Sequence, residues 1–444
     1  MARPRRHIPL NVFLNGRLVG RLNRQSSGAI DFQYDPSWLV WEHALPVSLS
    51  LPLREDRYIG APVIAVFDNL LPDSTPTRRR MAERVHAQGI DAYDLLAAVG
   101  RDCVGALQFL PDGVEPGAAG AVDGRPVDGK EIARLLGDLA SAPLGLGEDE
   151  DFRISIAGAQ EKTALLFWKT RWYKPLTTTA TTHILKPQIG RLPNGIDLSY
   201  SVENEFFCLK LTAALGLPSA AVAIEEFEGH CVLVVERFDR RWTGDNRLLR
   251  LPQEDCCQAL SVPPSLKYES EGGPGIPAIL NLLKGSDQPE ADQTTFLKAV
   301  IAFWLLGATD GHAKNFSVFL SPGGRFRMTP LYDVISAQPS LDAGQIQRNK
   351  MKLAMAVGDS RHYVVDSVMP RHFVQTAAKA GIGAGLVTSI FDELLTQAPT
   401  AVEQVTVSLP RAFPAEVADS ISNGFKTRLR RLEGHDTKDR YATN

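Results

Sequence analysis

Residues 309–315 read Thr-Asp-Gly-His-Ala-Lys-Asn, and this stretch holds the strongest pattern in the 444-residue chain. Its acid and its amide, Asp310 and Asn315, stand in an Asp-x-x-x-x-Asn spacing. Phosphoryl transfer needs a carboxylate that orients and deprotonates the attacking hydroxyl, and it needs an oxygen ligand for magnesium nearby. The spacing supplies both groups, and it therefore predicts Asp310 as a catalytic base and Asn315 as a magnesium ligand.

A second metal ligand is expected further along the chain. Two strands, expected at 317–320 and 325–328, form a hairpin that precedes Leu331-Tyr332-Asp333. The carboxylate of this last residue stands where a kinase places its other magnesium ligand, and magnesium completes its shell with waters and phosphates. The alternative is that Asp310 and Asn315 cap a turn and that the downstream aspartate begins a helix. The ordered combination of spacing, hairpin and aspartate favours the metal site.

A loop that could cover a nucleotide lies upstream, at residues 153–162, between strands expected at 152–156 and 163–168. Small residues in it allow backbone amides to approach phosphates. The loop matches neither Gly-x-x-x-x-Gly-Lys-Ser/Thr nor Gly-x-Gly-x-x-Gly, and the alternative is a simple turn at Gly158-Ala159.

Lys186 ends a strand expected at 183–186, where a lysine can neutralise the α- and β-phosphates. The alternative is a lysine at a strand edge. A helix expected at 202–215 begins with Glu203 and Glu205. We expect Glu205 to pair with the lysine, although acidic residues are also favoured at a helix N-terminus by the helix dipole.

The segment Val234-Val235-Glu236-Arg237-Phe238-Asp239-Arg240 ends the last of these strands. Backbone groups of Glu236 and Phe238 are expected to bind the adenine edge, and the alternative is a strand end with surface salt bridges. These features follow one another in the order found in kinases: nucleotide loop, lysine, helix glutamate, adenine segment, catalytic loop and metal aspartate. Together they predict an α+β, bilobed, kinase-like fold.

Composition agrees with a globular protein of at least two domains, because hydrophobic residues make up 44% and charged residues 22% of a long chain. The formal net charge of -3 gives no indication of nucleic-acid or membrane binding. Asn15-Gly16 predicts a hairpin near the N-terminus, and the Gly- and Pro-rich stretch 112–130 predicts a linker.

No apolar signal core follows the basic N-terminus, and the longest apolar stretch, near 299–308, is about half of what spans a bilayer. The cysteines, five in number, contain no Cys-x-x-Cys pair, which favours reduced thiols. We therefore expect a cytoplasmic protein that does not associate with membranes.

The chain resembles the HipA family, the serine/threonine protein kinase toxins of bacterial toxin–antitoxin modules. The resemblance covers nearly the whole chain. It is carried by the strings Asn69-Leu70-Leu71-Pro72-Asp73-Ser74, Gly100-Arg101-Asp102, the loop 151–162, Val235-Glu236-Arg237-Phe238-Asp239-Arg240, Leu251-Pro252-Gln253-Glu254-Asp255, Tyr268-Glu269-Ser270, Gly272-Gly273-Pro274-Gly275 and the stretch 307–317.

The resemblance implies a bilobed fold distantly like protein and lipid kinases, with an extra N-terminal α/β subdomain and a mainly helical C-terminal lobe. The expected division is an N-terminal subdomain at 1–110, a linker with a short helix at 111–148, a nucleotide-binding part at 149–240 and a helical part with the catalytic loop at 241–444. It implies Asp310 as the proton acceptor, with magnesium on Asn315 and Asp333. The ATP contacts that it implies are Ala157, Gly158, Ala159, Gln160, Glu161, Lys162, Lys186, Glu236, Arg237, Phe238, His312, Ala313, Lys314, Asn315, Tyr332 and Asp333.

The resemblance also implies autophosphorylation of Ser155, which in the family expels the nucleotide loop and silences the kinase. The family's partner is HipB, a helix-turn-helix antitoxin, and the pair represses its own promoter. Residues 376–381 are poor in basic side chains, so we expect the antitoxin to supply most of the affinity for operator DNA. Substrates of the family are translation components such as aminoacyl-tRNA synthetases.

Two other functions compete with this interpretation. The Asp310-Gly-His-x-x-Asn315 pattern is also similar to phosphoinositide-kinase loops, which would make the chain a small-molecule or lipid kinase. A kinase-like co-repressor without catalysis is the second, and the intact set of base and metal positions argues against it.

Overall fold

The structure is a computed structural model of the whole chain, and it describes residues 8–146, 153–158 and 160–439. The chain divides into two compact units, which are described one at a time. The first unit comprises Met1–Pro187, Glu225–Ser265 and Ser317–Phe326, and the second comprises Gln188–Ile224, Leu266–Phe316 and Arg327–Asn444.

The first unit begins with a five-stranded antiparallel sheet in the order β4-β3-β2-β1-β5. The predicted hairpin is confirmed, because β1 and β2 meet at Asn15-Gly16, where both residues have positive φ as a type I′ turn requires. Buried Phe32, Phe67 and Phe109 pack edge to face between sheet and helices, with centroids 5.4–5.5 Å apart. The elements are β1 Leu10–Leu14, β2 Arg17–Arg24, β3 Ile30–Tyr34, α1 Pro36–Leu39, β4 Tyr58–Ile59, α2 Ala61–Asp68, α3 Thr75–Arg84, α4 Ala92–Val99 and β5 Leu107–Pro111.

A second sheet, in the order β12-β13-β9-β7-β8-β6, belongs to the first unit except for residues 222–224 of β12, and it carries the predicted nucleotide elements. Strand β9 lies between β7 and β13, and Lys186 on it stands opposite Leu233. Ile132 and Leu136 of α5 pack on Leu165 in one buried cluster. The bounds are β6 Gly124–Val127, α5 Gly129–Gly137, β7 Thr163–Trp168, β8 Arg171–Pro175, β9 His183–Pro187, β12 Val222–Phe227 and β13 His230–Glu236.

Shorter elements complete the first unit. The expected strands at 317–320 and 325–328 are confirmed as β17 and β18, and β16 pairs with β17. The expected strand at 152–156 is wrong for its described part, because residues 153–158 form only a single bridge, from Ile154 to Asp102. The bounds are β14 Arg240–Trp242, β15 Leu248–Arg250, β16 Gln253–Asp255, α7 Cys256–Ala259, β17 Ser317–Ser321 and β18 Arg325–Met328.

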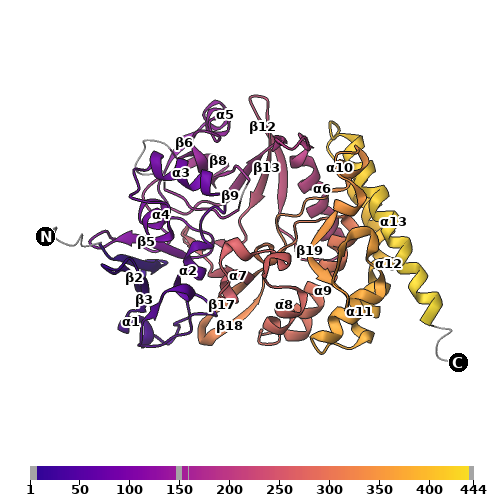
Figure 1. Cartoon of the computed structure of the whole chain (residues 1–444). Coiled ribbons are helices and arrows are strands. Elements are labelled where there is room, and N and C mark those ends of the chain that lie inside the picture. Colours follow the sequence, from indigo (N-terminus) through magenta and orange to yellow (C-terminus); the bar gives the residue numbers. More distant parts are fainter. Residues whose placement is uncertain (1–7, 147–152, 159, 440–444) are drawn as a thin grey trace. The chain divides into compact units, whose positions relative to one another are not determined.

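The second unit is mainly helical. The C-terminal half of helix α9 is buried, and the helix packs on α13 (Figure 1). The apolar stretch at 299–308 is therefore the last part of a core helix and the two residues that follow it. Buried Arg428 of α13 donates from Nε to the Leu305 carbonyl (2.9 Å), which holds the last turn of α9. The bounds are β10 Gly190–Arg191, β11 Asp197–Leu198, α6 Ser201–Ala214, α8 Ile276–Leu283, α9 Pro289–Leu306, α10 Gln338–Asp342, β19 Lys352–Val357, β20 His362–Val364, α11 Pro370–Lys379, α12 Ala384–Val407 and α13 Ala415–Asp439.

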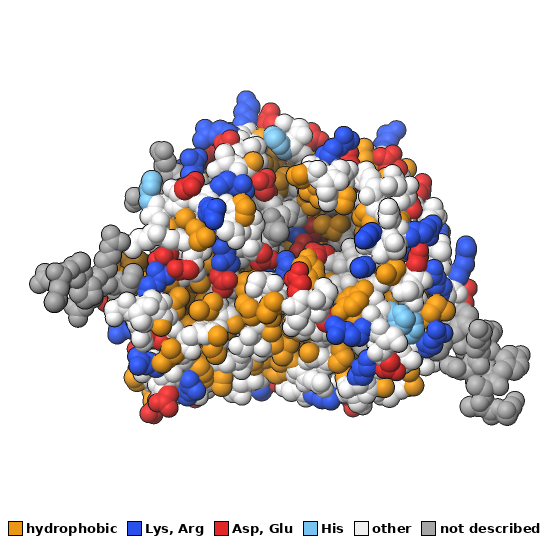
Figure 2. Space-filling model, in the orientation of Figure 1, with side chains coloured by type: hydrophobic (Ala, Val, Ile, Leu, Met, Phe, Trp, Pro, Cys, Tyr) orange, Lys and Arg blue, Asp and Glu red, His pale blue; other side chains and the backbone are white. Residues whose placement is uncertain are grey.

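Figure 2 shows basic and acidic side chains interspersed over the visible face, as a net charge of -3 suggests. All five cysteines are free thiols. Among the described residues, no helix has both the length and the apolarity needed to cross a bilayer.

Candidate active site

The segment after α9 folds into a tight turn around the backbone of Asp310. Gly307 ends the helix in the left-handed conformation. The Asp310 carbonyl then accepts from the His312 N–H (2.8 Å) and from Nδ2 of Asn315 (2.7 Å). A short 3-10 helix, Ala313–Asn315, closes the turn. The amide nitrogen of the buried Asn315 is used in its bond to the Asp310 carbonyl, so the amide oxygen is the atom of this side chain that a cation could bind. The side chain of Asp310 is exposed.

After β18 the chain comes back to the turn at 310–315 with Tyr332 and Asp333. The Tyr332 hydroxyl donates to the Lys314 carbonyl (2.7 Å), and Asp333 has a positive φ of 59°, a conformation that non-glycine residues seldom adopt. Burial lowers the pKa of His312, and the nearby carboxylates of Asp310 and Asp333 oppose that shift. Both carboxylates therefore act electrostatically on this imidazole, whose buried Nδ1 has no hydrogen-bond partner among the described residues.

The predicted base, Asp310, has a further partner that the spacing of residues did not reveal. The hydroxyl of Tyr268 donates to Oδ1 of Asp310 (2.6 Å), and its ring packs edge-on against His312 with centroids 4.9 Å apart. Tyr268 lies in a string that the resemblance singled out without a role. Its distance along the chain from Asp310 gave no signal of contact.

In the first unit, the predicted nucleotide loop is folded back on its own lysine. Nζ of buried Lys162 donates to the Ala157 carbonyl (2.7 Å), and Gly158 has a φ of 104°, which favours glycine. Nε2 of Gln160 donates to the carbonyl of Pro187 (3.2 Å), at the end of the strand that carries Lys186. The loop is thus fixed beside that strand. Ala159 lies outside the described residues, Glu161 is exposed and Lys186 is buried.

Residues 236–238 offer a nucleotide mainly their backbone. Arg237 is buried: its guanidinium binds Asp239 and Asp102, and its N–H donates to the Thr182 carbonyl. Glu236 is exposed at the end of β13, and the ring of Phe238 meets Phe319 edge-on. The Arg237 side chain therefore belongs to a structural network, and adenine binding by the backbone of Glu236 and Phe238 stays a prediction.

The centre of that network is Asp102, which sequence reasoning left without a role. Its buried carboxylate faces Arg237, Arg240 and Arg250 at 2.9–3.4 Å. Burial alone would raise its pKa, but the three guanidinium groups hold the pKa of Asp102 well below its usual value. Asp102 is thus ionised, and its carboxylate holds Arg237 and Arg240 at one end of the segment 237–250 and Arg250 at the other.

Ser155 is fully buried. Its hydroxyl donates to the Leu70 carbonyl (2.8 Å), and its N–H donates to the Asp102 carbonyl (2.9 Å). Glu205 is buried on α6 of the second unit, whereas Lys186 belongs to the first, and their pairing stays a prediction.

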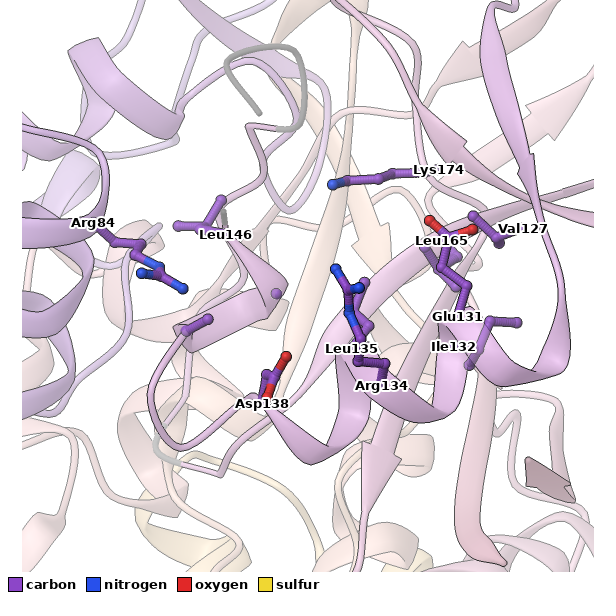
Figure 3. Close-up of a pocket in the computed structure, with 12 residues that line it drawn as sticks. Arg84, Val127, Glu131, Ile132, Arg134, Leu135, Asp138, Leu146, Leu165 and Lys174 are labelled. Carbon is purple, nitrogen blue, oxygen red and sulfur yellow. The ribbon is translucent and has the colours of Figure 1, made fainter. Parts of the chain in front are cut away.

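A cavity of about 140 Å³ lies elsewhere in the first unit, between α3, α5 and the second sheet. Figure 3 shows Arg84, Arg134 and Lys174 directed toward its centre. None of the residues that line it is a predicted ATP contact. Within the described part of the chain, no cluster of three or more His, Cys, Asp or Glu residues could hold a metal on its own.

Comparisons with known proteins give a consistent result. Residues 154–402 match the family model of the HipA-like C-terminal domain, and residues 10–110 match that of the HipA N-terminal domain. A Sinorhizobium fredii protein that carries a kinase name, Y4mE, is 38% identical over 403 residues, which cover 89% of this chain and 91% of that one. The serine/threonine-protein kinase toxin HipA of Shewanella oneidensis is 27% identical over 417 residues, covering 91% and 90%.

A solved structure has the same fold. HipA of Shewanella oneidensis, determined in complex with HipB and operator DNA, superposes with a TM-score of 0.79 at 26% identity over 96% of each chain. The predicted α+β fold class is thereby confirmed.

Proposed function

The chain belongs to the HipA family, whose named members are kinases, and from this premise we propose that it is an ATP- and magnesium-dependent serine/threonine protein kinase. The observation that carries the proposal is one turn of the second unit: Asn315 bonds the Asp310 carbonyl there, and Tyr332, the neighbour of Asp333, bonds the Lys314 carbonyl of the same turn. A base and two oxygen donors, one amide and one carboxylate, are the set that phosphoryl transfer requires.

In this proposal Asp310 orients the acceptor hydroxyl and takes its proton as the oxygen attacks the γ-phosphorus, while the bond from that phosphorus to the β,γ-bridging oxygen breaks and ADP leaves. Its exposure supports the role, because a protein acceptor must reach it. Lys186 offsets phosphate charge, and the amides of the loop 157–162 approach the phosphates. The neutral state of His312, favoured by burial, allows the imidazole to contact nucleotide without adding a cation to the base.

The donor chemistry fits magnesium. Magnesium prefers oxygen ligands and needs few from the protein when nucleotide phosphates supply the rest. The bond from Asn315 Nδ2 to the Asp310 carbonyl occupies the amide nitrogen, and the amide oxygen is the proposed ligand atom. Asn315 and Asp333 would hold the ion, whose chemical contribution is to offset charge on the transferred phosphate.

Ser155 is proposed as the site of autophosphorylation. Its hydroxyl is a donor to Leu70 in a fully buried position, and a phosphate dianion can neither donate there nor be buried cheaply. Modification is therefore incompatible with this position of residues 153–158. The segment would leave it and take the nucleotide loop along, which silences the enzyme.

The proposed biological role is that of a toxin paired with a small helix-turn-helix antitoxin of the HipB type. Support comes from the similarity to HipA solved with HipB and operator DNA. The proposed substrate is a protein of the translation apparatus, such as an aminoacyl-tRNA synthetase, and operator DNA would be bound mainly through the antitoxin.

The test is transfer of radiolabel from γ-labelled ATP by purified wild type, Asp310→Asn and the control Asp392→Asn, which alters an exposed aspartate of α12. We expect wild type and control to label protein and the Asp310 variant to lose at least about a hundredfold in rate. Intact-mass analysis should find one phosphate on Ser155 in wild type and none in Asp310→Asn. Undiminished transfer by that variant would refute the proposal. Label found only on a lipid or metabolite would show that the substrate is not a protein.

A further inference from the structure

The segment Tyr268–Gly275 places a phenol on the proposed base. The hydroxyl of Tyr268 lies 2.6 Å from Oδ1 of Asp310, and its half-buried ring meets the imidazole of His312 at 79°. Both contacts lie within the second unit. The phenol therefore touches the carboxylate itself and also the residue that stands two positions after it.

The segment is held by contacts of Glu269 with residues 356 and 361 and by hydrogen bonds within its own backbone. The Glu269 carboxylate accepts from the Ala356 N–H of β19 (2.6 Å) and pairs with Arg361 (3.3 Å). The Tyr268 carbonyl accepts from the N–H groups of Glu271 and Gly273, each at 3.0 Å. A side chain whose backbone is fixed in this way can hold its hydroxyl in one place.

We propose that Tyr268 is a positioning residue for Asp310, an inference that rests on the proposed function of that aspartate. A carboxylate on an exposed turn has several accessible orientations, and a short hydrogen bond from a fixed phenol selects one of them. With Oδ1 occupied by Tyr268, Oδ2 is the oxygen that receives the proton of the acceptor hydroxyl. Within the string Tyr268-Glu269-Ser270, the first residue thus orients the base and the second anchors the first.

The role predicts a particular kinetic signature. Loss of the hydroxyl leaves the ring on His312, and it leaves the proposed ATP contacts unchanged. The base then spends less time in the productive orientation, and small errors in orientation cost rate more than binding. The rate constant for transfer should fall while the apparent KM for ATP stays the same.

The experiment compares full-length Tyr268→Phe with wild type, with Asp310→Asn, and with Tyr200→Phe, which removes the hydroxyl of an exposed tyrosine in the same unit. Radiolabel incorporated from ATP into the chain itself gives the rate constant and KM. We expect a loss of about tenfold or more in rate for Tyr268→Phe, with KM within about twofold of wild type and Tyr200→Phe unaffected.

A second variant, Gly275→Ala, keeps the phenol but adds a Cβ that would lie 2.6 Å from the Glu269 carboxyl carbon. It should give a smaller loss in the same direction. Wild-type rates in both variants, with Asp310→Asn inactive, would overturn the inference and leave the proposed function standing. An active Asp310→Asn would remove the proposed function itself. Phosphate found on Tyr268 in wild type would show that the phenol is an acceptor, which would also overturn the positioning role.

Discussion

Glu254 should make the stability of the first unit depend on pH. The residue lies on β16 and is fully buried: Oε1 accepts from the Leu49 N–H (2.8 Å), and Oε2 has no hydrogen-bond partner among the residues that the structure describes. Burial raises the pKa of Glu254 from 4.5 to about 8. Between these two values the unfolded chain loses the proton while the folded chain keeps it, so folding becomes less favourable as pH rises.

The size of the effect follows from that difference. The stabilisation is fully present below pH 4.5 and is lost by about pH 8, and the complete shift corresponds to at most about 5 kcal/mol of folding free energy. A glutamine at this position keeps the acceptor for Leu49 and cannot ionise. Glu254→Gln should therefore gain stability relative to wild type, by several kcal/mol between pH 5 and pH 8.5.

Thermal and urea unfolding of wild type, Glu254→Gln and the exposed control Glu226→Gln over this pH range is the appropriate assay. The stability difference between Glu254→Gln and wild type should grow with pH, and the control should follow wild type. A difference that stays constant from pH 5 to pH 8.5 would show that Glu254 is ionised in the folded chain, and it would refute the reasoning.

Other substitutions test the remaining parts of the account. Gly158→Ala adds a Cβ that would lie 2.6 Å from Nζ of Lys162, and it should raise the KM for ATP by about tenfold. The matched control is Gly113→Ala, because Gly113 has a similar φ and its added Cβ would meet no atom within 4 Å. Equal KM values for the two variants would argue against a role of the loop 157–162 in ATP binding. Asp102→Ala removes the shared partner of three buried guanidinium groups and should cost about 3–5 kcal/mol of unfolding free energy, measured by chemical denaturation. A loss under about 1 kcal/mol would mean that the network relaxes without this carboxylate.

The secondary structure could be predicted best where its interactions are local, as in the hairpins at Asn15-Gly16 and at Gly323-Gly324. Asp310 and Asn315 lie in a turn where both bonds to the Asp310 carbonyl come from within six residues, and the hairpin before Asp333 is closed by its own glycines. The mixed fold class followed from the order of such local patterns.

Prediction failed where partners come from distant parts of the chain. Residues 153–156 look like a strand, but their described backbone pairs with Asp102 instead of a neighbouring strand. Arg237 follows a strand end, and only the fold shows that its side chain is used up in a buried ion network. The contact between Tyr268 and Asp310 leaves no trace in spacing or periodicity, because a loop and a turn far apart in sequence make it.

The most direct test of the central claim is the magnesium dependence of ATP binding by Asp333→Asn, measured by calorimetry with and without magnesium. The account predicts that wild type and Asp392→Asn bind ATP at least about tenfold more tightly with the ion, and that Asp333→Asn loses most of this difference. An Asp333→Asn variant with the full magnesium dependence of wild type would show that this carboxylate holds no metal, and it would contradict the proposed phosphotransfer centre.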